Sequence, residues 1–116
     1  MPLPLQPGEG RDEHEQRPLR SGADRIRHVR RHDGGEFVVT RGGKRIAELT
    51  YDLSATTMAI DHTFVDPELR GAGIALKLVD AAVAWAREHQ RRIVPICPFV
   101  KTVFNRTPAK YADVRV

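Results

Sequence analysis

The sequence predicts a single mixed α/β (α+β) domain, in which an antiparallel meander precedes a strand–helix–strand unit. Two glycine-containing turns, Asp33-Gly34-Gly35 and Arg41-Gly42-Gly43, separate short apolar runs. Apolar residues then recur at helical spacing from Ala72 to about His89, and a short apolar run follows the helix. A chain of 116 residues with 41% hydrophobic residues is long enough for one core.

The first half of the domain is expected to be a sheet in which each strand pairs with the next strand along the chain. The two turns bracket residues 37–40, and residues 46–51 follow the second turn, so these runs predict a hairpin. Residues 26–31 make a weaker first strand, because charges separate Ile26 from Val29. Residues 57–64 make a fourth strand, and together the four runs predict an antiparallel meander.

The second half is expected to place a helix on that sheet. Charged residues lie largely on the helix side opposite to an apolar stripe. Residues 93–96 show no alternation, which is typical of a covered strand that runs parallel to the strand before the helix through a right-handed crossover. Pro95 cannot donate to a ladder and predicts a gap in it. The stripe consists of Ile74, Leu78, Val79, Ala82, Val83, Trp85 and Ala86.

Residues 1–24 are expected to be a disordered tail, and residues 25–116 the folded domain. The first 25 residues hold four of the eight prolines, five acidic and four basic side chains, with almost no apolar periodicity. No apolar run is long enough to span a membrane, and the N-terminus lacks a secretory pattern. Since the single Cys97 cannot form an internal disulfide, we expect a cytoplasmic protein.

The chain after its first 25 residues is basic, with fifteen Lys and Arg against ten Asp and Glu. A basic domain attracts polyanions, but these residues are dispersed, which is also typical of an ordinary solvated surface. A nucleic-acid-binding domain is unlikely because no exposed aromatic residues are interleaved with the charges. No His-x-x-x-His or Cys-x-x-Cys pair occurs, so no metal site is expected.

A glycine-containing loop between the fourth strand and the helix is the strongest functional signal. Gly71 and Gly73 allow a ligand to approach the backbone closely, and the helix that follows offers unpaired N–H groups to an anion. The loop therefore predicts a phosphate-bearing ligand, although a tight turn without a ligand has the same pattern. The candidate binding residues are Arg70, Gly71, Ala72, Gly73, Ile74 and Ala75. Arg70 could contact a phosphate or simply be solvated.

Three motifs in order resemble the GNAT superfamily of N-acetyltransferases. Arg70–Ala75 reads Arg-x-x-Gly-x-Ala, which resembles the pyrophosphate loop of that superfamily. Pro95-Ile96-Cys97-Pro98-Phe99-Val100 resembles the P-x-C-P-F/Y-V motif of a small single-domain subfamily, and Asp61-His62-Thr63-Phe64-Val65 resembles its HT-x-V strand. The likeness runs from about Arg25 to the C-terminus.

The resemblance implies a mixed, mostly antiparallel sheet with a central helix, a βαβ unit and a short C-terminal helix. It also implies acetyl-coenzyme A as cosubstrate, with its pantetheine arm between two strands that splay apart near Pro95 and Pro98. Backbone N–H groups of Phe64 and Val65 would polarise the acetyl carbonyl. The subfamily lacks N-terminal helices that elsewhere shape the acceptor site, so the amine acceptor is undefined; a protein side chain or polyamine would suit an open groove.

Two side chains are candidates for catalysis. Cys97 could carry the acetyl group as a nucleophile or could be a small buried wall of the pocket. His62 could act as the base that deprotonates an amine, or could be held by hydrogen bonds on one face of the sheet, where alternation puts it with Ile60 and Phe64. Tyr111 is expected to close the core with Phe99 and Phe104 rather than to act as an acid.

The remaining histidines, His14, His28, His32 and His89, are expected at the surface.

These observations predict an acetyl-coenzyme A dependent N-acetyltransferase, an acyltransferase that needs no metal. A coenzyme A-binding or protein-interaction module without turnover is the alternative, because no unmistakable acid and base pair appears in the sequence. Thiol release in the presence of an amine distinguishes the two. The oligomeric state is left open, since a second copy could cover an open sheet edge.

Overall fold

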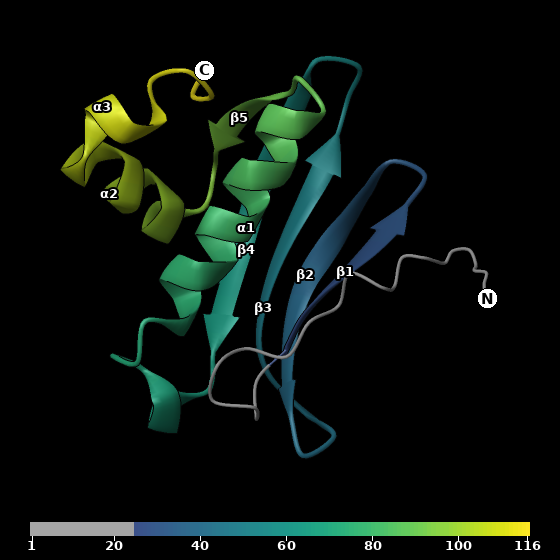
Figure 1. Ribbon diagram of the computed structural model, residues 1–116, viewed down its shortest axis with the longest axis vertical. Coiled ribbons are helices and arrows are strands. Elements are labelled where there is room, and N and C mark those ends of the chain that lie inside the picture. The colour runs from purple at the N-terminus through teal and green to yellow at the C-terminus, as the bar shows by residue number, and fades with distance from the viewer. Residues whose placement is uncertain (1–24) are drawn as a thin grey trace.

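A computed structural model describes residues 25–116 of the protein. Its five strands form one sheet in which they follow each other in chain order, and the long helix α1 (Ile74–Glu88) covers one face of this sheet (Figure 1). The predicted tail, residues 1–24, lies outside the described residues. The elements are β1 (Arg25–Arg31), β2 (Gly34–Arg41), β3 (Lys44–Leu53), β4 (Thr57–Val65), the 3-10 helix η1 (Pro67–Leu69), α1 (Ile74–Glu88), β5 (Arg92–Pro95), α2 (Pro98–Arg106) and α3 (Pro108–Tyr111).

The sheet confirms the predicted meander and the strand–helix–strand unit. Strands β1 to β4 pair antiparallel with their sequence neighbours, and β5 pairs parallel to β4. The turn after β1 consists of His32 and Asp33, so Gly34 and Gly35, which the sequence assigns to this turn, instead begin β2. The predicted turn at Gly42 and Gly43 joins β2 to β3. The fold class is therefore the expected mixed and mostly antiparallel α/β architecture.

Helix α1 buries the apolar stripe that its sequence predicts. All seven stripe residues are buried, and Trp85 is the most exposed of them at only 8%. In Figure 1 the helix lies across the sheet, and its stripe packs on side chains of β2, β3 and β4 in one core. The helix begins at Ile74 rather than at the predicted Ala72, because Gly71 and Gly73 both have a left-handed backbone.

The C-terminal helices pack beside β5 and are tied back to α1. Phe104 and Tyr111 are both fully buried and stack with ring centroids 4.5 Å apart, as expected for residues that close the core. Phe99 does not join them: it is 37% exposed, so that part of the prediction is wrong. Arg87 of α1 donates two hydrogen bonds to Asp113, at 2.9 and 3.0 Å, which fixes the C-terminal segment against α1.

Strand β5 ends at Pro95, where the sequence predicts a gap in the ladder. The parallel register stops at the pair Ile60 and Pro95, and β4 continues for five more residues without β5 beside it. The next two backbone N–H groups, those of Ile96 and Cys97, both donate to the carbonyl of Ile60, at 3.1 and 2.9 Å. The chain then enters α2 at Pro98. From Asp61 to Val65, the edge of β4 opposite to β3 therefore has no pairing strand within the described residues.

An irregularity in β4 changes the face on which His62 lies. Thr50 of β3 pairs with His62, but the next residue, Tyr51, pairs with Ile60, so Asp61 is an extra residue in β4. Strict alternation across Asp61 is therefore lost. His62 shares the face without α1, called the open face below, with Phe64, while Ile60 is buried on the α1 face. The predicted grouping of His62 with Ile60 is wrong for this reason.

His28 is not the surface residue that the sequence suggests. Its ring stacks on Phe37 with centroids 4.0 Å apart, and its Nε2 lies 2.5 Å from the hydroxyl of Tyr51. Burial, with smaller contributions from the positive charges of Arg30 and His89, lowers the pKa of His28 to about 4. His89 is exposed, as expected, although its ring stacks on Trp85 with centroids 4.0 Å apart.

The depressed pKa of His28 predicts a loss of stability in mild acid. The unfolded chain takes up a proton near pH 6.5 and the folded chain only near pH 4, so stability is complete above pH 6.5 and falls as the pH drops toward 4. For this half-buried ring we expect a loss of about 1–2 kcal/mol, after allowance for solvent screening. Urea unfolding between pH 7.5 and 4.5 measures it. His28→Gln should remove most of this pH dependence, whereas the exposed His32→Gln should leave it unchanged.

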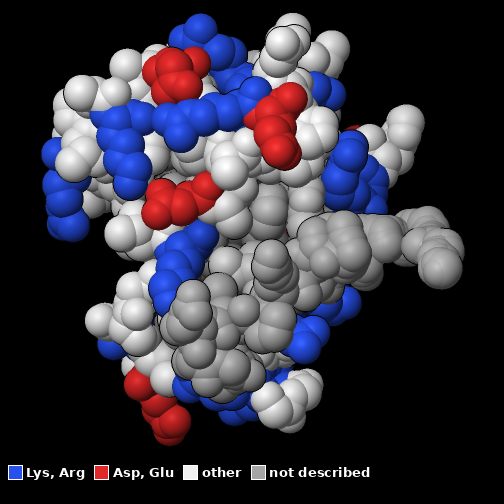
Figure 2. All heavy atoms as spheres, viewed as in Figure 1, with Lys and Arg blue, Asp and Glu red and all other residues white. Residues whose placement is uncertain are grey.

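Charges of both signs are interspersed on the face that carries α1, as Figure 2 shows. This agrees with the dispersed charge expected from the sequence, and the view shows no single basic stripe among the coloured residues. Within residues 25–116, helices of the length and hydropathy needed to cross a membrane are absent.

Candidate functional site

A mostly apolar cavity of about 630 Å³ opens between the free end of β4, the glycine loop and the first turn of α1. Phe99 of α2 forms part of its wall, which explains why this side chain is not in the core. The volume is typical of a site for a small molecule or cofactor. The lining residues are Thr63, Phe64, Val65, Leu69, Arg70, Gly71, Gly73, Ile74, Ala75, Leu76 and Phe99.

The loop below the cavity is held by its own hydrogen bonds. The Asp66 carboxylate accepts from the N–H of Glu68 at 3.0 Å and starts η1. Gly71 and Gly73 have φ values of +92° and +79°, a conformation that favours glycine, and a Cβ added to either would meet no atom within 4 Å. The space on that side is therefore open to a ligand.

The first turn of α1 presents unpaired backbone donors to this open space. The first bond of the helix runs from the N–H of Lys77 to the carbonyl of Gly73, at 3.1 Å. The N–H groups of residues 73–76 thus have no acceptor within the helix, and all four of these residues line the cavity. No acidic residue lies in the first turn to compete for the positive end of the helix dipole. This geometry suits a phosphate.

The free edge of β4 forms the opposite wall of the cavity. The N–H of Asp66 donates to Ile46 of β3 at 2.8 Å, so alternation along the strand directs the backbone groups of Phe64 toward β3 as well. The backbone groups of Thr63 and Val65 then point to the free edge beyond Ile60. This edge can bind an extended ligand through main-chain hydrogen bonds.

Cys97 lies at the inner end of this edge, at the start of α2. Its sulfur is 3.5 Å from the hydroxyl of Thr63, and its side chain is only 5% exposed. Thr63 lines the cavity whereas Cys97 does not, so Cys97 lies behind Thr63 as seen from the cavity. Thr63 is not among the predicted site residues. Its position two residues before Val65 on a strand edge could have suggested it.

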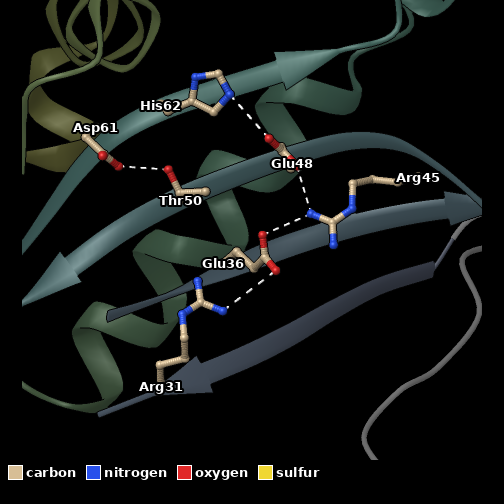
Figure 3. A network of polar contacts seen from close by, with 7 residues as sticks. All are labelled: Arg31, Glu36, Arg45, Glu48, Thr50, Asp61 and His62. Carbon is tan, nitrogen blue, oxygen red and sulfur yellow. Dashed lines mark hydrogen bonds and ion pairs between the residues drawn. The ribbon is translucent and has the colours of Figure 1, made fainter. Parts of the chain in front are cut away.

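His62 is not brought together with Cys97. Figure 3 shows that it belongs to a chain of charged contacts across the open face, which runs from Arg31 through Glu36, Arg45 and Glu48 to His62. The Glu48 carboxylate lies 3.3 Å from Nε2 of His62 and 2.8 Å from Arg45. The two candidates for catalysis therefore lie on opposite faces of β4.

The structure places seven of the eight predicted cofactor-binding residues on the cavity wall. The exception is Ala72, whose N–H donates to the carbonyl of Leu69 at 3.2 Å within the loop. Tyr111 lies away from the cavity and donates to Asp80 at 3.4 Å, consistent with a core role. Within residues 25–116, there is no cluster of metal-ligating side chains.

Comparison with known proteins identifies the family. A family model described as GCN5-related N-acetyltransferase matches residues 36–114, which run from the third residue of β2 past α3 and include every residue of the cavity wall. The chain belongs to the GCN5-related N-acetyltransferase family. This family is the one that the motifs of the glycine loop and β4 indicated; the finer subfamily defined by P-x-C-P-F/Y-V is not distinguished by the match.

Individual relatives of this GCN5-related chain are larger proteins. An uncharacterized N-acetyltransferase of Methanocaldococcus jannaschii is 31% identical over 75 residues, which cover 59% of this chain and 33% of that protein. A ribosomal-protein-alanine N-acetyltransferase from Brucella melitensis biovar Abortus 2308 superposes with a TM-score of 0.53 at 18% identity, covering 66% of this chain and 62% of the other.

An aminoglycoside N-acetyltransferase, AAC(6')-Iy, in complex with CoA superposes with a TM-score of 0.51 at 18% identity, covering 69% of this chain and 60% of the other. At these identities, the two structural likenesses support the fold alone. The chain thus spans about a third of the first relative and about three fifths of these two structures.

Proposed function

We propose that this chain is an acetyl-coenzyme A dependent N-acetyltransferase, with the cavity at the end of β4 as its cosubstrate site. One observation carries the proposal: a single cavity joins the glycine loop, the unpaired donors of α1 and the free edge of β4. Phosphates require the first two features, and an extended amide chain requires the third.

Each wall of the cavity has a proposed partner in the cosubstrate. The N–H groups of Gly73, Ile74 and Ala75 would hold the pyrophosphate, together with Arg70. Thr63 and Val65 would bond the pantetheine amides through the β4 edge, and the exposed rings of Phe64 and Phe99 would cover its apolar parts. Acetyl-coenzyme A supplies an activated acetyl thioester.

At the inner end of the cavity, we place the acyl transfer on Cys97. The Cys97 sulfur attacks the acetyl carbonyl, its proton passes through the Thr63 hydroxyl to the departing thiolate, and an acetyl group remains on Cys97. The nitrogen of an amine then attacks this acetyl group, the C–N bond forms, and the Cys97 thiolate is released. Backbone N–H groups at the free β4 edge would stabilise the negative charge on the carbonyl oxygen in both steps.

The amine is proposed to approach from the open face, on the side of β4 away from α1. His62 lies there, held by Glu48, but on the face of β4 opposite to Cys97, so the proton that the amine loses would pass to the departing Cys97 thiolate rather than to His62. The described residues place no helix over this face, which leaves it accessible to a large acceptor such as a protein side chain or a polyamine.

Thiol release is the experiment that tests this function. With acetyl-coenzyme A and a panel of primary amines, including lysine peptides and spermidine, we expect thiol release above the rate without amine and an acetylated product by mass spectrometry. Release that never exceeds the amine-free rate, with tight acetyl-coenzyme A binding, would favour the binding module without turnover. Absence of any binding would overturn both functions.

A further inference from the structure

Strand β1 is a regular outer edge of the sheet that carries an unusual density of arginine. Four of its seven residues are arginine, and it pairs with β2 along its whole length without an irregularity. Within the described residues, no strand pairs with its other edge (Figure 1). The family match begins at residue 36, so β1 and its charges lie outside the part shared with the family.

The backbone of β1 offers donors and acceptors to an added strand. A Cβ on Gly35 of β2 would lie 2.5 Å from the carbonyl oxygen of Val29, which places that carbonyl on the β2 side. Alternation along the strand then directs the N–H and C=O groups of Ile26, His28 and Arg30 to the outer edge. An extended segment could pair with these groups.

The side chains of β1 determine which segment would fit. His28 and Arg30 lie on the α1 face, where His28 stacks on Phe37 and Arg30 lies 5.0 Å from the centre of Trp85. Arg25, Arg27 and Arg31 therefore share the open face at every second or fourth residue. Among the described residues, Arg25 and Arg27 have no carboxylate partner, and Arg31 lies 3.9 Å from Glu36.

A second copy of β1 is a poor occupant of this edge, because edge-to-edge pairing would bring arginine against arginine, and like charges on paired strands are destabilising. An acidic strand has the complementary charge. We propose that the outer edge of β1 binds an extended peptide segment of a partner protein that carries Asp or Glu at alternate positions, by β-strand addition.

The probe for this interface is a fluorescent peptide of alternating glutamate and threonine, as long as β1, measured by anisotropy against the full chain. We expect it to bind, and the matching lysine and threonine peptide not to bind. Arg25→Glu with Arg27→Glu should weaken binding about tenfold or more, since two attractive cross-strand pairs become repulsive. The matched control, Lys101→Glu with Arg106→Glu on α2, changes the charge equally and should have an effect below twofold.

Two further measurements separate strand addition from simple charge attraction. A glutamate and threonine peptide with N-methylated threonines keeps its charge but cannot donate along one edge, and should bind at least about tenfold more weakly to the unmodified chain. Amide hydrogen exchange of Ile26, His28 and Arg30 should slow when the unmethylated peptide is added.

Equal binding of the methylated peptide would overturn the proposal, and so would displacement of the probe by a single-stranded oligonucleotide without protection of these amides. Slow exchange at the three positions before any peptide is added would show that the chain already covers this edge itself, which also overturns it.

Discussion

Gly73→Glu is expected to reduce the affinity for acetyl-coenzyme A by about 100-fold or more. Gly73 lines the cavity at the first turn of α1, and a Cβ there would point into space that contains no protein atom within 4 Å. The glutamate side chain would fill that space, repel phosphate and neutralise the positive end of the helix. Calorimetric titration of acetyl-coenzyme A into both proteins measures the loss.

Gly43→Glu is the matched control for this experiment. Gly43 has a φ of +82°, against +79° for Gly73, and its Cβ would also point into open space, but it lies in the turn between β2 and β3, away from the cavity. Both variants should lose about 1–2 kcal/mol of stability from the left-handed backbone. Only Gly73→Glu should lose the ligand. Equal affinity in the two variants would move the phosphate site away from α1.

Cys97→Ala is expected to lower kcat by about 100-fold or more, with the affinity for acetyl-coenzyme A changed by less than about twofold. The sulfur contacts Thr63 at the inner end of the cavity but does not line it, so its removal takes away the proposed nucleophile and leaves the binding walls intact. Single-turnover rates and calorimetry on the same preparation separate chemistry from binding.

The acetylated form of Cys97 provides the direct observation. In the absence of an amine, the unmodified chain should carry an acetyl group on the peptide that contains Cys97, and Thr63→Val should slow its formation because the hydroxyl no longer transfers the proton. Cys97→Ser serves as the comparison of similar size with a weaker nucleophile. Full turnover by Cys97→Ala would assign the reaction to direct attack of the amine on the thioester.

Local patterns were sufficient to predict most of the fold. The turn at Gly42 and Gly43 predicts where β2 ends and β3 begins, the apolar stripe predicts α1, and the loss of alternation predicts β5. Each of these signals arises from residues within one element and its ends. The glycine loop before α1 is predicted by local signals of the same kind. Its glycines need a left-handed backbone wherever the loop packs, and the helix after it leaves its first N–H groups unpaired by geometry alone.

Side-chain partners in different elements could not be predicted in this way. The sequence predicts that His28 is a surface residue of a charged strand. In the structure its ring stacks on Phe37 and meets Trp85 edge-on, and burial there lowers its pKa. The sequence predicts that Phe99 is a core residue. In the structure it follows the end of β5 and lines the cavity instead. Both outcomes depend on how α1 and α2 pack on the sheet.

The sequence by itself determined the order of the elements, the glycine loop before α1 and the end of β5 at Pro95. Only the tertiary structure decided which candidates for catalysis share a site. The extra residue Asp61 reverses the alternation of β4, so His62 lies on the open face, while Thr63 meets Cys97 across the gap on the α1 side. The two-residue repeat of side-chain direction along a strand assigns faces correctly only while the pairing with the neighbouring strand is regular. The pairing of β4 with β3 joins residues that are distant in the sequence, so a pattern within β4 alone does not reveal the irregularity.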